Sequence, residues 1–490
     1  MPTLEQALGQ ITTLQQEMAV LRAQIEWFKK QLFGGGKGER LDRAQLLLQL
    51  DALEKLAAQA EAPVQRVSYE RSTPTPRPPA GEAFAKLPVQ ETVEIVPAEV
   101  KAQPEAYERI GEERTFEIEI TPPKLFKREF VRPKFRHKTD RAQPPLLAPA
   151  PARPVTGGYA SAGLLAWVTT AKYVDHLPLY RQEKMLARWG APIPRQTLSD
   201  WIAQVAGWTE ILRRQLHAAL LKGDYLQLDE TWMRCNDPDH PSGKTATGWL
   251  WALSRPGGDV VFFWRMSRRH EELPPLLEGY RGLLHSDGYE AYPQFVANHP
   301  GVTWLSCWAH ARRKFTEALA KAPATAGFVL RLIGQLYRWE REWDRRKVGP
   351  AWRAALRSSH FKPTLALLKR VAEHLRKKAL PQSPLGLACG YLLNHWPSLC
   401  AHCDHGQSKL DTNSVENAIR GSAVGKKNYL FVGHPDAGER AAIIYSLVES
   451  CRRRGIDPFA YFKDVLARLP SMNSKSDFSV LLPANWKPAA

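Results

Sequence analysis

The first part of the chain shows a regular spacing of apolar residues. Over about four heptads they recur in steps of three and four, at Leu4, Ala7, Ile11, Leu14, Met18, Leu21, Ile25, Phe28 and Leu32. The spacing predicts either a coiled-coil seam or an amphipathic helix that packs on its own domain, and we favour self-association through a coiled coil. A glycine run at 34–36 then breaks the pattern, and a second helix is expected to follow. Residues 1–61 are therefore predicted to be a helical oligomerisation region.

Two proline-rich stretches, 62–90 and 144–157, have the composition of linkers. Between them, residues 91–143 contain short alternating runs that predict a small β unit. Its last stretch, 124–138, interleaves seven Lys or Arg residues with three phenylalanines. This stretch predicts a strand whose basic face contacts a DNA backbone, or an ordinary half-buried strand with a solvated outer face.

Residues 158–221 have a helical pattern. A helix over 179–189, the turn residue Gly190 and a second helix from Pro194 through Val205 resemble a helix-turn-helix. The second helix of such a motif would offer three polar side chains to a DNA groove, those of Arg195, Gln196 and Ser199. Short helical pairs are common, so an ordinary pair of helices is the alternative.

After residue 222 the apolar period changes from that of helices to that of strands. Strand-like runs rich in aromatic and aliphatic residues occur at 225–231, 247–255, 260–267, 282–287 and 302–307. Turn residues join the second and third runs as a hairpin, and helices are expected at 269–280 and 309–321. The predicted fold is α/β: a ribonuclease-H-like catalytic core with a helical insertion, preceded by an N-terminal coiled coil, a small β unit and a helical DNA-binding region.

The order of these elements also predicts where the core is interrupted. The first part of the core is expected at 222–321 and a helical insertion at 322–406. A further core helix is expected at 407–428, followed by a C-terminal domain and tail at 429–490.

The chain is long and strongly basic. It has 490 residues, with 68 Lys and Arg against 50 Asp and Glu, and a formal net charge of +18. This charge favours a polyanionic partner such as nucleic acid, although many proteins are basic for no specific reason. No run of about 18 apolar residues occurs, so no membrane span is expected. All six cysteines lie after residue 234, which predicts no disulfide framework and a reducing, cytoplasmic location.

Three carboxylates stand in distinctive local settings. Asp229 and Asp287 each close a strand-like run, and Glu416 lies in an early turn of a predicted helix. The first and fourth strands are neighbours in the predicted sheet, so both aspartates could face one point. Carboxylate oxygens suit Mg²⁺ or Mn²⁺ rather than zinc, and two such ions could activate a water or a 3′-hydroxyl for phosphodiester chemistry. The alternative for each aspartate is an ordinary turn residue at a strand end.

One short stretch suggests zinc. Cys400 and Cys403 form a single Cys-x-x-Cys around His402, whereas a structural zinc site needs four ligands. Cys389 or His395 could complete such a site. A helix end followed by a loop is the simpler interpretation, so zinc is not expected here.

Several distinctive motifs follow one another along the chain, at His176–Glu183, Leu228–Thr231, Ser286–Tyr289, Cys307–Phe315, Asn413–Arg420, Gly425–Phe431 and Gly438–Ala442. With these residues assembled, the chain resembles transposases of the insertion sequence 66 family over most of its length. The resemblance implies a DDE-type DNA transposase with Asp229, Asp287 and Glu416 as its metal-binding triad.

The resemblance also implies roles for residues beyond the triad. It places three side chains in a Cys-Trp-Ala-His motif near the active site, those of His310, Arg312 and Arg313. Basic side chains that follow the glutamate are positioned to meet DNA phosphates, at Arg420, Lys426 and Lys427. Family members commonly carry a cysteine zinc-binding module before the catalytic domain, but residues 95–140 contain no cysteine. We therefore expect the β unit to persist without zinc.

The sequence thus predicts a DNA transposase that binds terminal inverted repeats, nicks them with two Mg²⁺ or Mn²⁺ ions, and joins the freed 3′-hydroxyls to target DNA. The expected partners are transposon ends, target DNA, at least one further copy of the chain and any accessory proteins of the same element. Two other classes stay open. One is a catalytically silent DNA-binding protein derived from a transposase, and the other is a structure-specific nuclease built on the same sheet.

Overall fold

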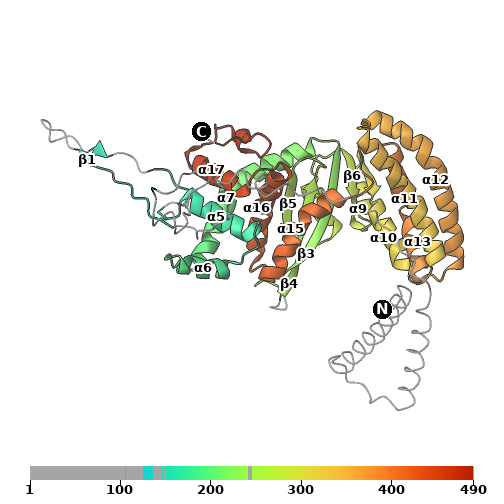
Figure 1. Cartoon of the computed structure of the whole chain (residues 1–490), viewed down its shortest axis with the longest axis horizontal. Coiled ribbons are helices and arrows are strands. Elements are labelled where there is room, and N and C mark those ends of the chain that lie inside the picture. The colour runs from blue at the N-terminus through green and yellow to red at the C-terminus, as the bar shows by residue number, and fades with distance from the viewer. Residues whose placement is uncertain are drawn as a thin grey trace, which may run out of the picture. The chain divides into compact units, whose positions relative to one another are not determined.

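The computed structural model describes residues 105, 125–135, 146–147, 151–155, 157–240 and 245–488. The chain divides into two units, 1–117 and 118–490, and all that follows concerns the second. The expected coiled coil and first linker lie outside the described residues, as does most of the expected β unit. Figure 1 labels the helices and strands.

The described part of the expected β unit is a minimal strand pair. Strand β1 (Lys134–Phe135) pairs antiparallel with β2 (Leu146–Leu147), which lies in the stretch expected to be a linker. Residues 125–133 have no regular secondary structure, and Phe126 and Phe130 are exposed. The strand expected over 124–138 is therefore absent at 125–133, and the expectation that it is half-buried there is wrong.

The helical region begins with three helices, α5 (Ala162–Tyr173), α6 (Leu179–Arg188) and α7 (Arg195–Leu221). Gly190 makes the turn between α6 and α7 with a φ of +86°, a conformation that favours glycine. A carboxylate oxygen of Glu183 on α6 accepts a hydrogen bond from the first backbone N–H of α7, at 3.0 Å. Helix α7 extends far beyond the expected end near residue 205, because its apolar side chains stay buried as far as Leu220.

A five-stranded mixed sheet follows, in the order β5-β4-β3-β6-β7. The strands are β3 (Tyr225–Asn236), β4 (Thr245–Ser254), β5 (Val260–Arg265), β6 (Gly282–Ser286) and β7 (Val302–Ser306). Strand β4 is antiparallel to both of its neighbours, β3 and β5, whereas β3, β6 and β7 are parallel. This mixed α/β sheet is consistent with the predicted ribonuclease-H-like core, and the expected neighbours β3 and β6 are indeed paired.

The helix expected at 269–280 is replaced by shorter pieces. A 3-10 turn, η3 (His270–Glu272), leads into a single helical turn, α8 (Leu273–Leu276). Pro274 and Pro275 explain the break, because proline lacks a backbone donor and disfavours a helical residue before it. Two regular helices flank β7, namely α9 (Ala291–Ala297) and α10 (Trp308–Ala318).

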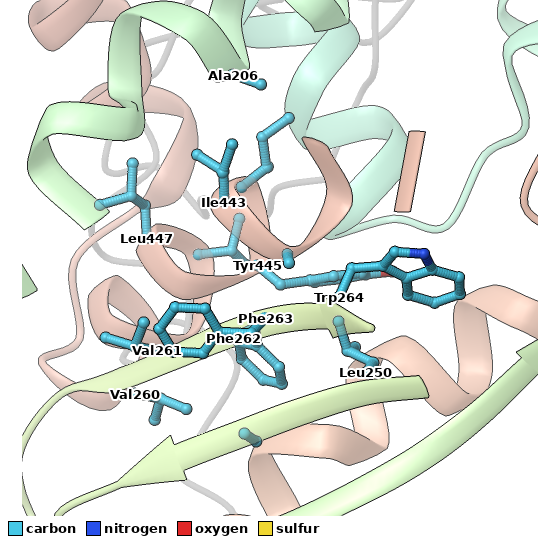
Figure 2. Packing of buried hydrophobic residues seen from close by; sticks show 14 of the residues in the cluster. Ala206, Leu250, Val260, Val261, Phe262, Phe263, Trp264, Ile443, Tyr445 and Leu447 are labelled. Carbon is cyan, nitrogen blue, oxygen red and sulfur yellow. The ribbon is translucent and has the colours of Figure 1, made fainter. Parts of the chain in front are cut away.

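The main hydrophobic core lies between the β5 side of the sheet and helices α7 and α16 (Pro435–Arg453). Figure 2 shows β5 beside α16, with Val260–Trp264 on the strand and Ile443, Tyr445 and Leu447 on the helix, in one hydrophobic cluster. The residues after 429, which were expected to form a C-terminal domain and tail, pack into this shared core through α16. The remaining C-terminal helix is α17 (Pro458–Arg468).

Helix α16 also protects the free edge of the sheet. Three alternate backbone N–H groups of β5 have no neighbouring strand, and side chains of α16 accept their hydrogen bonds. Ser450 accepts from Val260 at 3.2 Å, Ser446 from Phe262 at 2.8 Å, and Glu439 from Trp264 at 3.2 Å. An edge strand is thereby covered rather than left open to pairing with another chain.

The expected insertion is helical and has its own apolar cluster, which also includes α10. Its elements are α11 (Pro323–Arg345), α12 (Pro350–Lys378), α13 (Pro384–Asn394), α14 (Trp396–Cys400) and η4 (Ala401–Cys403). The chain then returns to the sheet through α15 (Asn413–Tyr429). Among the described residues, no helix is both long and apolar enough to cross a membrane.

Candidate active site

Three carboxylates from separate parts of the chain lie near the β3–β6 part of the sheet. Asp229 is carried by β3, two residues beyond Gln227, which is the last residue paired with β6. Asp287 follows directly after β6, and Glu416 lies in the first turn of α15. Asp229 is thus not at a strand end as expected, because β3 continues beyond it to Asn236.

The electrostatics of Asp229 show how close these groups are. Burial raises the pKa of Asp229 well above its usual range, and the negative charges of Glu230, Asp287 and Glu416 raise it further. A neighbouring like charge shifts a pKa in this way only across a short distance. The negative charges of Asp287 and Glu416 are therefore near enough to act on Asp229, and the three residues are called the carboxylate cluster below.

Contacts at both carboxylate oxygens orient the side chain of Asp287. One oxygen accepts a hydrogen bond from the backbone N–H of Tyr289 at 2.9 Å. The other lies 3.8 Å from a guanidinium nitrogen of Arg268. A strand end followed by an Asx-type turn therefore positions this side chain.

Glu416 owes its position to the start of α15. Its backbone N–H donates to the carbonyl of Thr412 at 3.1 Å, which closes the first helical turn. A carboxylate near a helix N-terminus is favoured by the helix dipole. The preceding loop is tied to the sheet, because Gln227 donates to the carbonyl of Asp411 at 2.9 Å and Cys307 accepts from the Thr412 N–H at 3.4 Å.

Glu230, next to Asp229, has a different role. Its side chain is fully buried and lies 2.5 Å from the guanidinium of Arg268, and it also accepts a hydrogen bond from Tyr292. Burial and Asp287 raise the pKa of Glu230, while Arg268 and Tyr292 lower it. Sequence reasoning missed this network, and the adjacent acidic pair Asp229–Glu230 was the only signal of it.

Beneath the carboxylates a buried polar network joins the two parallel strands. The Tyr225 hydroxyl is hydrogen-bonded to His285 at 2.9 Å and accepts from Gln227 at 3.0 Å. It also accepts from the backbone N–H of Lys409 at 3.1 Å. Gln227 and His285 each stand two residues before a clustered aspartate, so the network fixes both strands just below the site.

His310 on α10 faces the cluster, with its Nε2 atom 3.8 Å from a carboxylate oxygen of Glu416. Burial lowers the pKa of His310, although Asp287 and Glu416 act in the opposite direction. Arg312 and Arg313 follow on the same helix and are exposed. The charge of Arg313 also lowers the pKa of His310.

The remaining predicted residues fall into two groups. On α15, Arg420 and Lys427 are exposed, whereas Lys426 donates a hydrogen bond to the backbone carbonyl of Trp232 at 3.0 Å. At the start of α7, Arg195 and Gln196 are exposed and Ser199 is half-buried. No described contact joins this second group to the carboxylate cluster.

The cluster suits a divalent metal by its chemistry. Its donors are carboxylate oxygens, and a cation would relieve the mutual repulsion that raises the pKa of Asp229. Among the described residues, no three His, Cys, Asp or Glu side chains are grouped around one point. Mg²⁺ commonly binds through only one or two carboxylates, with waters and substrate phosphates as its other ligands, so the residues present fit it.

The Cys400–Cys403 stretch forms the end of α14 and the following 3-10 turn. Both ring nitrogens of the buried His402 are already hydrogen-bonded, to Ser408 at 3.0 Å and to the carbonyl of Ser306 at 2.9 Å. Burial raises the pKa of the Cys400 thiol to about 12, which disfavours the thiolate that zinc requires. These contacts make His402 a structural residue.

Comparison with known proteins gives consistent matches along the chain. Residues 157–440 match the family described as Transposase IS66 family, and residues 446–484 match the IS66 C-terminal element. An uncharacterized protein of Sinorhizobium fredii, y4jD, is 33% identical over 396 residues, which cover 78% of this chain and 77% of that protein. A second uncharacterized protein of the same strain, y4qI, is 29% identical over 478 residues, with 93% and 87% covered.

Proposed function

Since the chain belongs to the IS66 family of transposases, we propose that it binds the inverted-repeat ends of an insertion sequence, cuts DNA strands there and joins the freed 3′ ends to target DNA. Membership of a DDE transposase family implies that the protein is an enzyme that cleaves phosphodiester bonds, acts on DNA and uses a divalent metal. The observation that carries the finer proposal is the coupling of Asp229 to Asp287 and Glu416, three carboxylates from separate parts of the chain.

In this proposal, Asp229, Asp287 and Glu416 hold two Mg²⁺ or Mn²⁺ ions. When bound, such ions supply an activated water or 3′-hydroxyl as nucleophile and stabilise the leaving oxygen. The chain's own contribution is to hold three negative charges together at a half-buried position where they repel one another. This arrangement favours cation binding because a cation removes the repulsion.

Other residues of the chain orient the carboxylates. Arg268 and the Tyr289 N–H fix the two oxygens of Asp287, so the side chain is positioned before DNA arrives. Burial lowers the pKa of His310, and a neutral imidazole beside Glu416 can orient that carboxylate without neutralising it. Both contacts support preorganised binding rather than a direct chemical step.

DNA contacts are proposed on either side of the cluster. Arg420 and Lys427 lie on exposed turns of the helix that carries Glu416, where they would meet backbone phosphates. Arg195, Gln196 and Ser199 at the start of α7 would contact the transposon end. Because two ends must be processed together, we also propose at least a dimer, assembled through the predicted coiled coil, with accessory proteins where the element encodes them.

The product of the reaction separates this proposal from its alternatives. Purified full-length protein is incubated with Mg²⁺ and end-labelled DNA taken from the two flanks of its gene, with unrelated DNA of equal length as the control. A transposase is expected to cleave the flank DNA and to join its 3′ ends to a second DNA. Cleavage without joining would indicate a nuclease, and binding without cleavage would indicate a silent DNA-binding protein. Either result would overturn the proposal.

A further inference from the structure

The hairpin formed by β3 and β4 extends beyond the rest of the sheet. Strand β3 pairs with β6 only over residues 225–227, but with β4 over residues 227–236. On one face of the projecting part, Met233 and Cys235 are buried. On the other face, the side chains that alternate with them are exposed, at Trp232, Arg234, Asn236, Thr245 and Thr247.

This exposed face borders a cavity of about 820 Å³ that is widely open to solvent. Trp232 and Arg234 line it from β3, and Thr245 and Thr247 line it from β4. Known binding sites for small organic groups have volumes of roughly 300–1,000 Å³. The cavity is thus large enough for an aromatic ligand with its polar substituents.

The chemistry of the cavity wall combines an aromatic ring with cations. Trp232 is 49% exposed, which is unusual for so large an apolar side chain that lies within a strand. The Lys426 ammonium lies 4.5 Å from the centre of its ring and fixes it through a cation–π contact. Arg234 is exposed on the same face two residues further on. The wall also contains one acidic side chain, that of Asp237, and one of its carboxylate oxygens accepts a hydrogen bond from the backbone N–H of Asp239 at 3.1 Å.

An exposed indole beside basic side chains is the combination that binds single-stranded nucleic acid. Bases stack on the ring, and the cations pair with phosphates. A base inside a duplex offers only its edges, so its face can reach Trp232 only after the base has left the stack. The wall therefore selects for unpaired bases rather than for duplex.

The position of the cavity links it to the carboxylate cluster. Trp232 lies three residues after Asp229 on the same strand, about 10 Å along it, and because side chains alternate along a strand the two point to opposite faces of the sheet. Lys426 lies on the same helix as Glu416. Successive bases of one strand are about 3.4 Å apart in a duplex, so a DNA strand that passes from the cluster around β3 beside Lys426 would bring bases within a few nucleotides of the cut to the ring.

We propose that the Trp232 face of the β3–β4 hairpin binds unpaired nucleobases of the DNA strand that enters the carboxylate cluster. This inference rests on the proposed function and specifies its substrate: DNA whose bases are unstacked next to the cleavage point. Trp232 is then a positioning residue, because it holds the strand rather than taking part in the chemistry.

The test measures DNA binding without metal, so it does not depend on cleavage. Full-length wild type, Trp232→Ala and Trp232→Phe are titrated in EDTA against a fluorescein-labelled 20-nucleotide single strand and against the matching duplex. Trp232→Ala is expected to weaken single-strand binding by about 5- to 100-fold, the range for loss of one stacked base, and to leave duplex binding within about twofold. Trp232→Phe should retain most of the affinity, because a phenyl ring also stacks.

A matched control is Trp352→Ala, which removes an indole that is 73% exposed on α12. It should change neither affinity. The proposal is overturned if Trp232→Ala weakens both DNA forms equally or weakens neither. It is also overturned if that variant alters only the oligomeric state in light scattering, since the face would then contact another protein copy. A protein that binds single strands through Trp232 but never cuts DNA would refute the proposed function and leave this inference standing.

Discussion

Replacing Glu340 by glutamine tests how strongly the insertion depends on one buried charge cluster. Glu340 is 6% exposed and accepts hydrogen bonds from two guanidinium groups, those of Arg353 at 2.7 Å and Arg357 at 2.7 and 3.0 Å. Arg357 is fully buried, and its other donors bond the carbonyl of His402 at 2.8 Å and that of Ser408 at 2.7 Å. The cluster thus ties α11 and α12 to the segment that returns to the sheet.

The glutamine variant keeps the shape of Glu340 but removes its charge. The fully buried Arg357 then loses its acidic partner, whereas Arg353 keeps Asp344 at 2.7 Å, and breaking a buried pair of this kind costs about 3–5 kcal/mol. Backbone amides in α11 and α12 should therefore exchange their hydrogens faster by on the order of 10²–10³-fold. This holds for amides whose exchange rate is set by the equilibrium between the closed and the open helix. Hydrogen–deuterium exchange with mass spectrometry measures it helix by helix, which avoids assuming that a chain of this size unfolds in one step.

The matched control is Glu342→Gln, two residues along α11. Glu342 pairs with Arg345 and Arg346, whose side chains are 76% and 70% exposed, so its loss should leave the exchange of both helices unchanged. A change of less than tenfold in the Glu340→Gln variant would refute the reasoning. An equal change in the two variants would refute it as well, because burial would then not decide the cost.

Two further predictions concern other buried groups. Burial lowers the pKa of His402 to about 3, against about 6.5 in an unfolded chain, so its contribution to stability is complete above about pH 6.5 and is lost as the pH falls towards 3. The difference in melting temperature between wild type and His402→Gln should therefore shrink between pH 7 and pH 4, and a constant difference would contradict this. Ser446→Ala leaves the buried Phe262 N–H unpaired and should cost about 1–3 kcal/mol in thermal unfolding, whereas Ser359→Ala on the exposed face of α12 should not. Equal melting temperatures for the two serine variants would refute the role of Ser446.

The sheet was predictable because its strands carry strong local signals. Runs rich in apolar residues and the turn at 256–259 predicted the order of strands, and the pairing of β3 with β6 explains why Asp229 and Asp287 are close. The length of β3 was not recognised, since the polar residues after Leu228 look like a strand end. The alternation of exposed Trp232 and Arg234 with buried Met233 and Cys235 was the signal that the strand continues.

Long-range contacts were the part that the sequence could not supply. The Arg268–Glu230–Tyr292 network joins a loop residue to residues of β3 and α9, and no local spacing encodes such a meeting. Similarly, α16 covers the free edge of β5 only because the serines at 446 and 450 are one helical turn apart. Its sequence predicts a helix, but not which strand it covers. The helix expected at 269–280 failed for a local reason, because two prolines interrupt it.

The central claim is that Asp229, Asp287 and Glu416 together hold the metal ions that cut and join DNA. The most direct test is a strand-transfer assay with Mg²⁺ on flank DNA, comparing wild type with Asp229→Ala and Glu416→Ala. A control variant, Asp404→Ala, removes an exposed carboxylate outside the cluster. The account predicts that both cluster variants lose joining by on the order of 10⁴-fold while they still bind the DNA ends, and that the control keeps its activity. Joining at the wild-type rate by either cluster variant would contradict it.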